Sequence, residues 1–187
     1  GSGTISSYVW SNGIGTGATA TASPANATIS TVTTAYSITV TNSNACSVTG
    51  SVSVTINPKP NIGPINLSIC SQTPFKVTPQ NPGNGIVPPG TLYSWLPPTV
   101  AGNITGGVAG NNVIDSITGN LKSPDVVPHN AVYTVTPKSS AALGSCAGAS
   151  FTLTIQVNPK PHILPKATTI CGGSTIAISP QHLQSGD

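Results

Sequence analysis

Four cysteines are the residues of this sequence whose chemistry is easiest to foresee. They are Cys46, Cys70, Cys146 and Cys171. A zinc site needs closely spaced Cys or His ligands, but the sequence has no C-x-x-C pair and its three histidines lie far apart. Cysteines in a chain of this composition are typical of disulfides formed in an oxidising compartment. We therefore expect disulfide chemistry, with no metal and no cofactor.

The acid–base side chains are too few to indicate a catalytic site. His129 with Asp115 or Asp125 would supply two members of a Ser–His–Asp triad. A triad is identified by its geometry, however, and a chain with 23 serines offers a third member by chance. Two aspartates are also too few for the oxygen-rich shell that calcium requires. The sequence predicts a protein that is not an enzyme.

The overall composition argues against two further classes of function. The 187 residues contain six Lys, three Asp and neither Arg nor Glu, whereas Ser, Thr and Asn number 23, 25 and 15. Nucleic-acid binding needs clustered Lys or Arg side chains that displace counterions. A membrane-spanning helix needs about 20 consecutive apolar residues. The sequence has neither pattern, so we expect no nucleic-acid binding and no membrane insertion.

A repeat of about a hundred residues organises the chain around these side chains. Asn57–Pro60 (NPKP) returns 101 positions later as Asn158–Pro161. Three further pairs keep an offset of 100 or 101: Cys46 with Cys146, Ile69-Cys70 with Ile170-Cys171, and Phe75-x-Val77 with Ile176-x-Ile178. Tyr8-x-Trp10 returns as Tyr93-x-Trp95 at an offset of 85, because the first copy is shorter between its Trp and its Cys. Repetition at a fixed period indicates a tandem array of modules.

The repeat frame divides the chain into three parts. Residues 61–158 contain every landmark once, so we expect one complete module there. Residues 1–57 correspond to the C-terminal part of a first module, and residues 162–187 to the N-terminal part of a third. The chain is therefore expected to be a segment of a longer array.

Alternating apolar and hydroxyl side chains predict that each module is built from β-strands. Tyr36, Ile38 and Val40 alternate with Ser and Thr, and residues 151–157 follow the same rule. This alternation is typical of antiparallel strands with one buried face, and a module of this size fits an immunoglobulin-like β-sandwich. The predicted class is all-β, in tandem sandwich modules. Each Pro-Lys-Pro piece follows the last strand of a copy and is expected to form a short, stiff connector.

Trp10 and Trp95 are the candidate core aromatics. Each follows a Tyr by two positions, so Tyr and Trp share one face of a strand. We expect both tryptophans between the two sheets, where a large ring contributes most to a small core. The alternative is an exposed aromatic platform that binds sugar.

The cysteines have two alternative pairings. Cys70 and Cys146 are the natural pair within the complete module, and this disulfide would stabilise it by about 4–5 kcal/mol on the chain-entropy model. Cys46 and Cys171 would then pair outside the segment. In a standard sandwich, however, the start of the second strand and the loop before the last strand lie at opposite ends, and Cα atoms more than about 7 Å apart cannot be bridged. A disulfide between neighbouring modules is the other alternative.

The complete copy contains four runs that are similar to a known repeat family. The runs are Ile69–Pro79, Gly85–Trp95, Ala131–Pro137 and Phe151–Pro159. They resemble the PKD-like/Ig-like tandem repeats of very large Bacteroidetes cell-surface adhesins, such as the gliding-motility adhesin SprB. The resemblance implies PKD-like or immunoglobulin-like β-sandwich modules, exported by the type IX system to the outer surface of a Gram-negative cell and used for adhesion or gliding motility.

The resemblance brings no catalytic residues, but it adds one modification site. Asp115-Ser116-Ile117 is similar to the O-glycosylation sequon described in Bacteroidetes, which makes Ser116 a candidate glycan attachment site.

Two functions follow from these observations. The first is a structural and adhesive stalk, whose partners are neighbouring repeats of the same chain and a target such as surface polysaccharide. The second is a carbohydrate-binding or spacer module of a secreted polysaccharide-degrading enzyme. Exposed coplanar aromatic residues would favour the second function.

Overall fold

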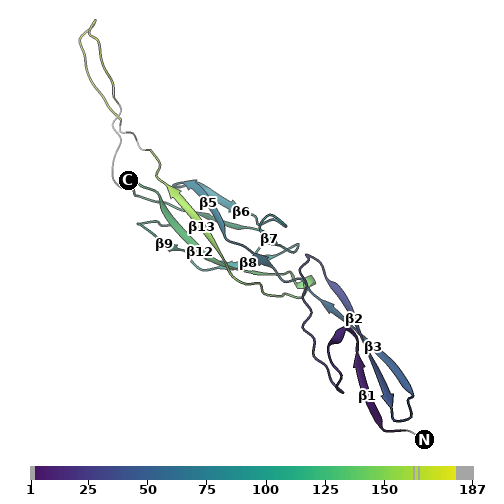
Figure 1. Ribbon diagram of the computed structural model, residues 1–187. Coiled ribbons are helices and arrows are strands. Elements are labelled where there is room, and N and C mark those ends of the chain that lie inside the picture. Colours follow the sequence, from purple (N-terminus) through teal and green to yellow (C-terminus); the bar gives the residue numbers. More distant parts are fainter. Residues whose placement is uncertain (1–2, 162, 164, 180–187) are drawn as a thin grey trace.

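The structure, a computed structural model, describes residues 3–161, 163 and 165–179 and consists almost entirely of β-strands (Figure 1). Within these residues the helical elements are two 3₁₀ turns, η1 (Ser11–Gly13) and η2 (Ala141–Leu143). The predicted all-β class is confirmed. No helix in the same part of the chain is long and apolar enough to cross a membrane.

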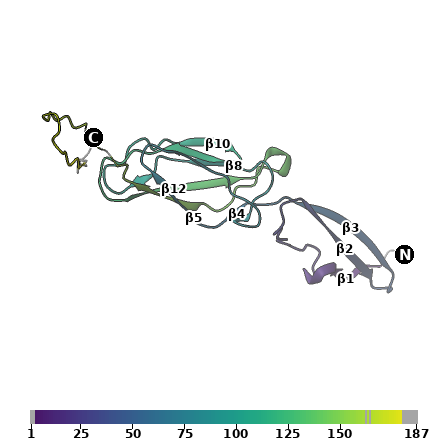
Figure 2. The same cartoon turned by 90° about the horizontal axis from the view of Figure 1, so that it is seen from above.

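The elements form two bodies placed end to end (Figures 1 and 2). A three-stranded sheet lies near the N-terminus, and a larger β-sandwich follows it. Residues 165–179 extend beyond the far end of the sandwich, and they contain no strand. The outline of the described residues is therefore elongated.

The N-terminal sheet consists of β1 (Ile5–Trp10), β2 (Val32–Asn42) and β3 (Ser47–Ile56), antiparallel and in that order. The β2–β3 hairpin closes on Asn42, whose Oδ1 accepts hydrogen bonds from the backbone N–H groups of Asn44 (3.0 Å) and Cys46 (2.9 Å). Such a side-chain-to-backbone turn is a common role of Asn. It fixes the register that the alternation of Tyr36, Ile38 and Val40 requires.

The sandwich comprises strands β4 to β13. Its larger sheet has the order β10-β8-β12-β13-β5, with β9 also paired to β12. All these pairs are antiparallel except β13–β5, which is parallel. Two short antiparallel pairs, β6–β11 and β4–β7, complete the module. The strand bounds are β4 Asn61–Ile62, β5 Ile65–Cys70, β6 Pro74–Val77, β7 Gly85–Ile86, β8 Leu92–Trp95, β9 Thr99–Val100, β10 Gly110–Ile114, β11 Ile117–Asn120, β12 His129–Lys138 and β13 Phe151–Asn158.

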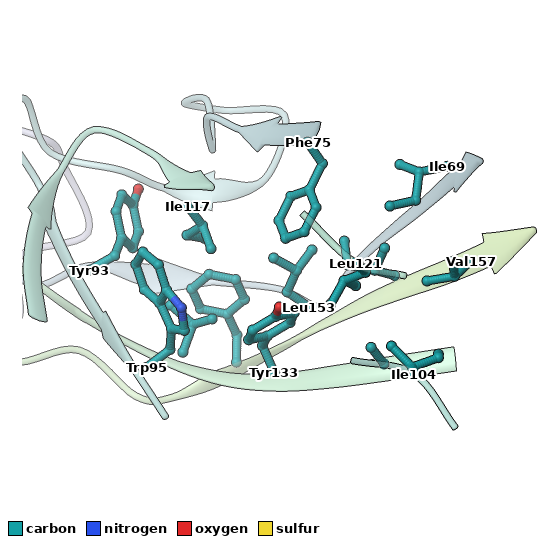
Figure 3. Close-up of a cluster of buried hydrophobic side chains, with 14 of the residues drawn as sticks. Ile69, Phe75, Tyr93, Trp95, Ile104, Ile117, Leu121, Tyr133, Leu153 and Val157 are labelled. Atoms are coloured by element: carbon teal, nitrogen blue, oxygen red, sulfur yellow. The ribbon is translucent and has the colours of Figure 1, made fainter. Parts of the chain in front are cut away.

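One hydrophobic core fills the space between the larger sheet and the β6–β11 pair (Figure 3). The inward residues of β12 and β13 alternate with exposed or half-buried ones, as period-two strands require. Tyr133 of β12 meets Phe75 of β6 edge to face, with ring centroids 6.1 Å apart. Tyr93 and Phe151 meet in the same way at 6.4 Å. Such pairs add roughly 0.5–1.5 kcal/mol beyond the area they bury.

The first Pro-Lys-Pro connector is packed into the joint between the two bodies. Pro58 and Pro60 are fully buried, whereas Lys59 is exposed. The β12–β13 loop lies against the connector, because a Cβ on Gly148 would meet the carbonyl oxygen of Pro60 and a Cβ on Gly144 would meet the Asn57 side chain. The glycines therefore allow the loop to pack closely against the joint.

Candidate functional site

The structure places Cys70 and Cys146 at opposite ends of the sandwich. Cys70 ends β5 and aligns with Asn158, the last residue of β13. Cys146 lies before the start of β13, where its N–H donates to Ser139 Oγ (2.9 Å). The eight residues of β13 lie between the position of Cys146 and that of Cys70. At about 3.3 Å per residue, the two cysteines are therefore more than about 20 Å apart along the strand.

All four thiols are free in the structure. Of the two pairings that the sequence left open, the one within the module, Cys70 with Cys146, does not fit this geometry, because the parallel pairing of β5 with β13 carries Cys70 away from the loop that holds Cys146. Cys46 lies in the β2–β3 turn, at the repeat position that corresponds to Cys146. Cys171 lies in the exposed segment after the sandwich, at the repeat position that corresponds to Cys70.

The two tryptophans lie in different environments. Trp95 is buried in the core, where Nε1 donates to the Val108 carbonyl (3.0 Å), and its ring lies against the Gly110 backbone. Trp10 is half-buried on the N-terminal sheet, and its Nε1 donates to the Gly17 carbonyl (2.9 Å). Of the eight aromatic side chains of the sequence, six are buried, and Tyr8 and Trp10 are half-buried. The molecule therefore offers no coplanar aromatic platform for a sugar ring.

Ser116 lies in the turn that joins β10 to β11. It is half-buried and follows Asp115, which adopts a left-handed conformation (φ 58°) and donates its N–H to the Thr91 carbonyl (3.0 Å). The candidate glycan site is thus on a tight, well-anchored turn.

His129 and Asp125 form the one acid–base pair among the residues that the structure describes. His129 Nε2 lies 3.0 Å from Asp125 Oδ2, and the same carboxylate accepts the Asn103 N–H (3.3 Å). The pair holds together the loops at this end of the sandwich. No described serine hydroxyl bonds to His129, so the described residues place no nucleophile beside the pair. Within the described ranges no group of three or more His, Cys, Asp or Glu side chains forms a metal cluster.

The buried tyrosines carry the main electrostatic perturbation of the interior. Burial raises the pKa of Tyr133, whose hydroxyl has no hydrogen-bond partner. Burial also raises the pKa of Tyr93, and the negative charge of Asp115 raises it further. Both side chains therefore stay protonated and neutral, so neither phenol is activated as a base or a nucleophile.

A groove lies on the outer face of the larger sheet. It lies over β8, β10 and β12, has a volume of about 610 Å³ and contains no charged side chain in its lining. Hydroxyl and amide groups line it together with an apolar wall. Its principal residues are Ser94, Leu96, Pro97, Asn111, Thr134 and Thr136.

The groove was not foreseen from the sequence, although one signal for it exists. Leu96-Pro97-Pro98 separates β8 from β9, and both of these strands pair with β12. Proline cannot donate to the ladder, so the chain leaves the sheet at these residues and Leu96 and Pro97 wall the groove. Neutral hydrogen-bonding groups beside an apolar wall suit an uncharged, hydroxyl-rich ligand.

Comparison with known families agrees with this architecture. The family described as PKD-like domain matches residues 67–161, which run from within β5 to just beyond β13. No curated protein matches the chain.

Proposed function

The chain belongs to the PKD-like domain family, and on this basis we propose that it is a structural and adhesive segment of a large protein on a bacterial cell surface. PKD-like domains are commonly extracellular modules of structural or adhesive role, and they are typically non-catalytic. The finer proposal follows the resemblance to gliding-motility adhesins such as SprB: a tandem array, exported by the type IX system and anchored at the outer membrane.

The joint between the two bodies carries this proposal. A flexible linker leaves its residues in water, but Pro58 and Pro60 are buried, and the β12–β13 loop of the sandwich lies against Asn57 and Pro60. Proline also fixes φ and so reduces the number of backbone conformations that the connector can adopt. A joint of this kind transmits force along the chain and keeps a surface at a fixed distance from the cell, which is what an adhesive stalk requires.

We assign residues 1–57, 61–158 and 162–187 to three consecutive modules, the outer two in part. In such an array Cys146 faces the preceding module and Cys70 faces the following one, because they lie at opposite ends of the sandwich. The cysteines are then suited to disulfides between neighbouring modules, each formed outside the cell from two thiols that lose two protons and pass two electrons to an oxidant such as dioxygen.

This assignment predicts that the chain alone forms no internal disulfide. Mass spectrometry of the monomer after air oxidation and alkylation, without reductant, is expected to show four modified thiols. Two modified thiols would instead demonstrate an internal pair and contradict the assignment.

We further propose that the groove over β8, β10 and β12 is the adhesive surface and that its target is a neutral polysaccharide. The support is the chemistry of the lining, which offers hydroxyl and amide partners and no charge. The adhesive contact would then depend weakly on salt, because no ion pair contributes to it.

The experiment for the main proposal locates the parent polypeptide. An antibody against residues 61–158 is used on intact cells and on cells shaved with protease. A band of several hundred kilodaltons that disappears after shaving is the expected result. A band of ordinary enzyme size in the culture medium would overturn the proposal and favour a carbohydrate-binding or spacer module of a secreted polysaccharide-degrading enzyme.

A further inference from the structure

Asn-Gly is the dipeptide in which an asparagine most readily loses its side-chain amide, and the sequence contains it twice, at Asn12-Gly13 and at Asn84-Gly85. The backbone nitrogen of the residue after Asn can attack the side-chain Cγ, and glycine presents this nitrogen without a Cβ that would obstruct the approach. The two sites share this intrinsic reactivity. A difference between them in the folded protein therefore comes from the structure around each site.

The turn that contains Asn84 holds its asparagine in place. Asn84 Oδ1 accepts the Gln80 N–H (2.8 Å), and the Asn84 N–H donates to the Gln80 carbonyl (2.8 Å). Gly85 belongs to β7, and its N–H donates to the Pro82 carbonyl (2.9 Å). A Cβ on Gly85 would meet the carbonyl oxygen of Asn61 in β4, so this nitrogen lies in a packed turn. Hydrogen bonds thus fix both reacting groups, and the site reacts only after the turn opens.

The turn that contains Asn12 leaves its asparagine exposed. Asn12 and Gly13 lie in the 3₁₀ turn η1, which buries no residue, and both are exposed. Asn12 has a left-handed backbone (φ 57°, ψ 18°), which is uncommon for a residue with a Cβ. A Cβ on Gly13 would meet nothing within 4 Å, so the space around the attacking nitrogen is open. Little therefore opposes the local opening that brings this nitrogen onto Cγ.

The exposure of Asn12 belongs to its position in the module. Trp10 ends β1 and corresponds to Trp95, which ends β8. Asn12 therefore corresponds to Pro97 of the complete module, and Pro97 is exposed as well. The complete sandwich leaves this position outside its core.

We propose that Asn12 is a site of spontaneous deamidation, with water as the co-reactant. The Gly13 nitrogen forms a bond to Cγ of Asn12 and loses its proton, the Cγ–Nδ2 bond breaks, and ammonia leaves. The product is a five-membered succinimide. Water then adds to one of its two carbonyl carbons. Cleavage of the bond between the nitrogen and Cγ gives Asp, and cleavage of the bond between the nitrogen and the backbone carbonyl carbon gives isoaspartate.

Either product changes the turn. Each places a carboxylate where the chain has a neutral amide, in a sequence with three Asp. Isoaspartate also inserts a methylene group into the backbone, beside the contacts that hold the turn on the sheet. In these contacts Trp10 Nε1 donates to the Gly17 carbonyl (2.9 Å), and Ser11 Oγ accepts the Ser37 N–H (2.9 Å). We therefore expect an aged chain to expose Trp10 more than a fresh chain does.

Peptide mapping by mass spectrometry tests the proposal on the full chain after incubation at mildly alkaline pH. The peptide that contains Asn12 is expected to gain the mass that replaces –NH2 by –OH and to separate into Asp and isoaspartate forms. Asn84 is the internal control. We expect Asn12 to react at least about tenfold faster than Asn84 in the folded chain, because an exposed turn opens at a lower free energy than a packed one. In urea the two sites are expected to react at comparable rates, because the structure no longer distinguishes them.

The variant Asn12→Gln supplies a second readout. Its longer side chain would have to form a six-membered ring, so this position is expected to stay unmodified. Iodide quenching of tryptophan fluorescence is expected to rise with age in the wild-type chain and to stay constant in the variant. An Asn12 that stays intact in the folded chain would overturn the proposal, and so would equal rates at Asn12 and Asn84 in the folded chain.

Discussion

At the scale of single residues, close contacts to glycine determine how the core packs. Gly119 of β11 lies opposite Phe75 of β6, and a Cβ there would lie 2.7 Å from Cζ of that ring. Gly110 brings the β10 backbone against the ring of Trp95. The Trp95 ring was predicted to lie in the core from the Tyr-x-Trp spacing, but these glycine contacts were not predicted, because nothing in a sequence shows which backbone a ring will approach.

We predict that Gly119→Ala destabilises the sandwich by about 1–3 kcal/mol, since the added methyl group forces the Phe75 ring to move in a packed core. Urea unfolding measures the change. Gly63→Ala is the control, because a Cβ at that position has no neighbour within 4 Å, and its effect is expected to stay within about 0.5 kcal/mol. Equal effects at the two positions would show that the Phe75 contact has no special role.

The buried tyrosines predict a loss of stability in alkali. Burial raises the pKa of Tyr93 and Tyr133 above their ordinary value of 10.0. The unfolded chain therefore releases the phenolic protons first. The stabilisation is complete below about pH 10 and is lost as the pH rises from there toward the folded pKa values.

Thermal melts between neutral pH and pH 11 check this prediction. The alkaline fall in melting temperature is expected to be shallower in Tyr133→Phe than in the wild-type chain. The same substitution removes a buried hydroxyl without a partner, so at neutral pH it is expected to be neutral or stabilising. A Tyr133→Phe variant with an unchanged alkaline fall would contradict the assignment to this residue.

At the scale of elements, the long strands follow from the sequence and the short ones do not. The alternation in residues 36–41 and 151–157 predicts β2 and β13, because a half-buried strand shows a period of two. Strands β4, β7 and β9 have two residues each, too few for any period. The parallel pairing of β5 with β13 depends on distant parts of the chain, so the sequence left two pairings of the cysteines open.

The sequence correctly predicted that a strand ends before the first Pro-Lys-Pro connector. It did not predict that Pro58 and Pro60 are buried. We predict that Gly148→Ala loosens the joint, because the new methyl group meets the Pro60 carbonyl and lies 2.9 Å from Cγ of Pro137. Hydrogen exchange in the peptide that covers residues 57–62 is expected to accelerate. The control is Gly172→Ala, where a Cβ meets nothing within 4 Å; faster exchange in both variants would refute a specific role of the loop.

At the scale of the whole molecule, the proposed function rests on shape and surface. The chain has six Lys, three Asp and about a third of its residues as Ser, Thr and Asn. The candidate groove shows the same neutral chemistry. The scarcity of charged residues is visible in the composition, whereas the groove itself depends on the proline-interrupted path from β8 to β9.

The central claim is that this chain is a stiff, elongated segment, and small-angle X-ray scattering of the dilute monomer tests it most directly. A compact protein of this length has a radius of gyration of about 16 Å. We predict a clearly larger value, with the asymmetric distance distribution of a rod in which the N-terminal sheet and the sandwich lie end to end. A radius of gyration near 16 Å would contradict the account, because it would mean that the two bodies fold back on each other.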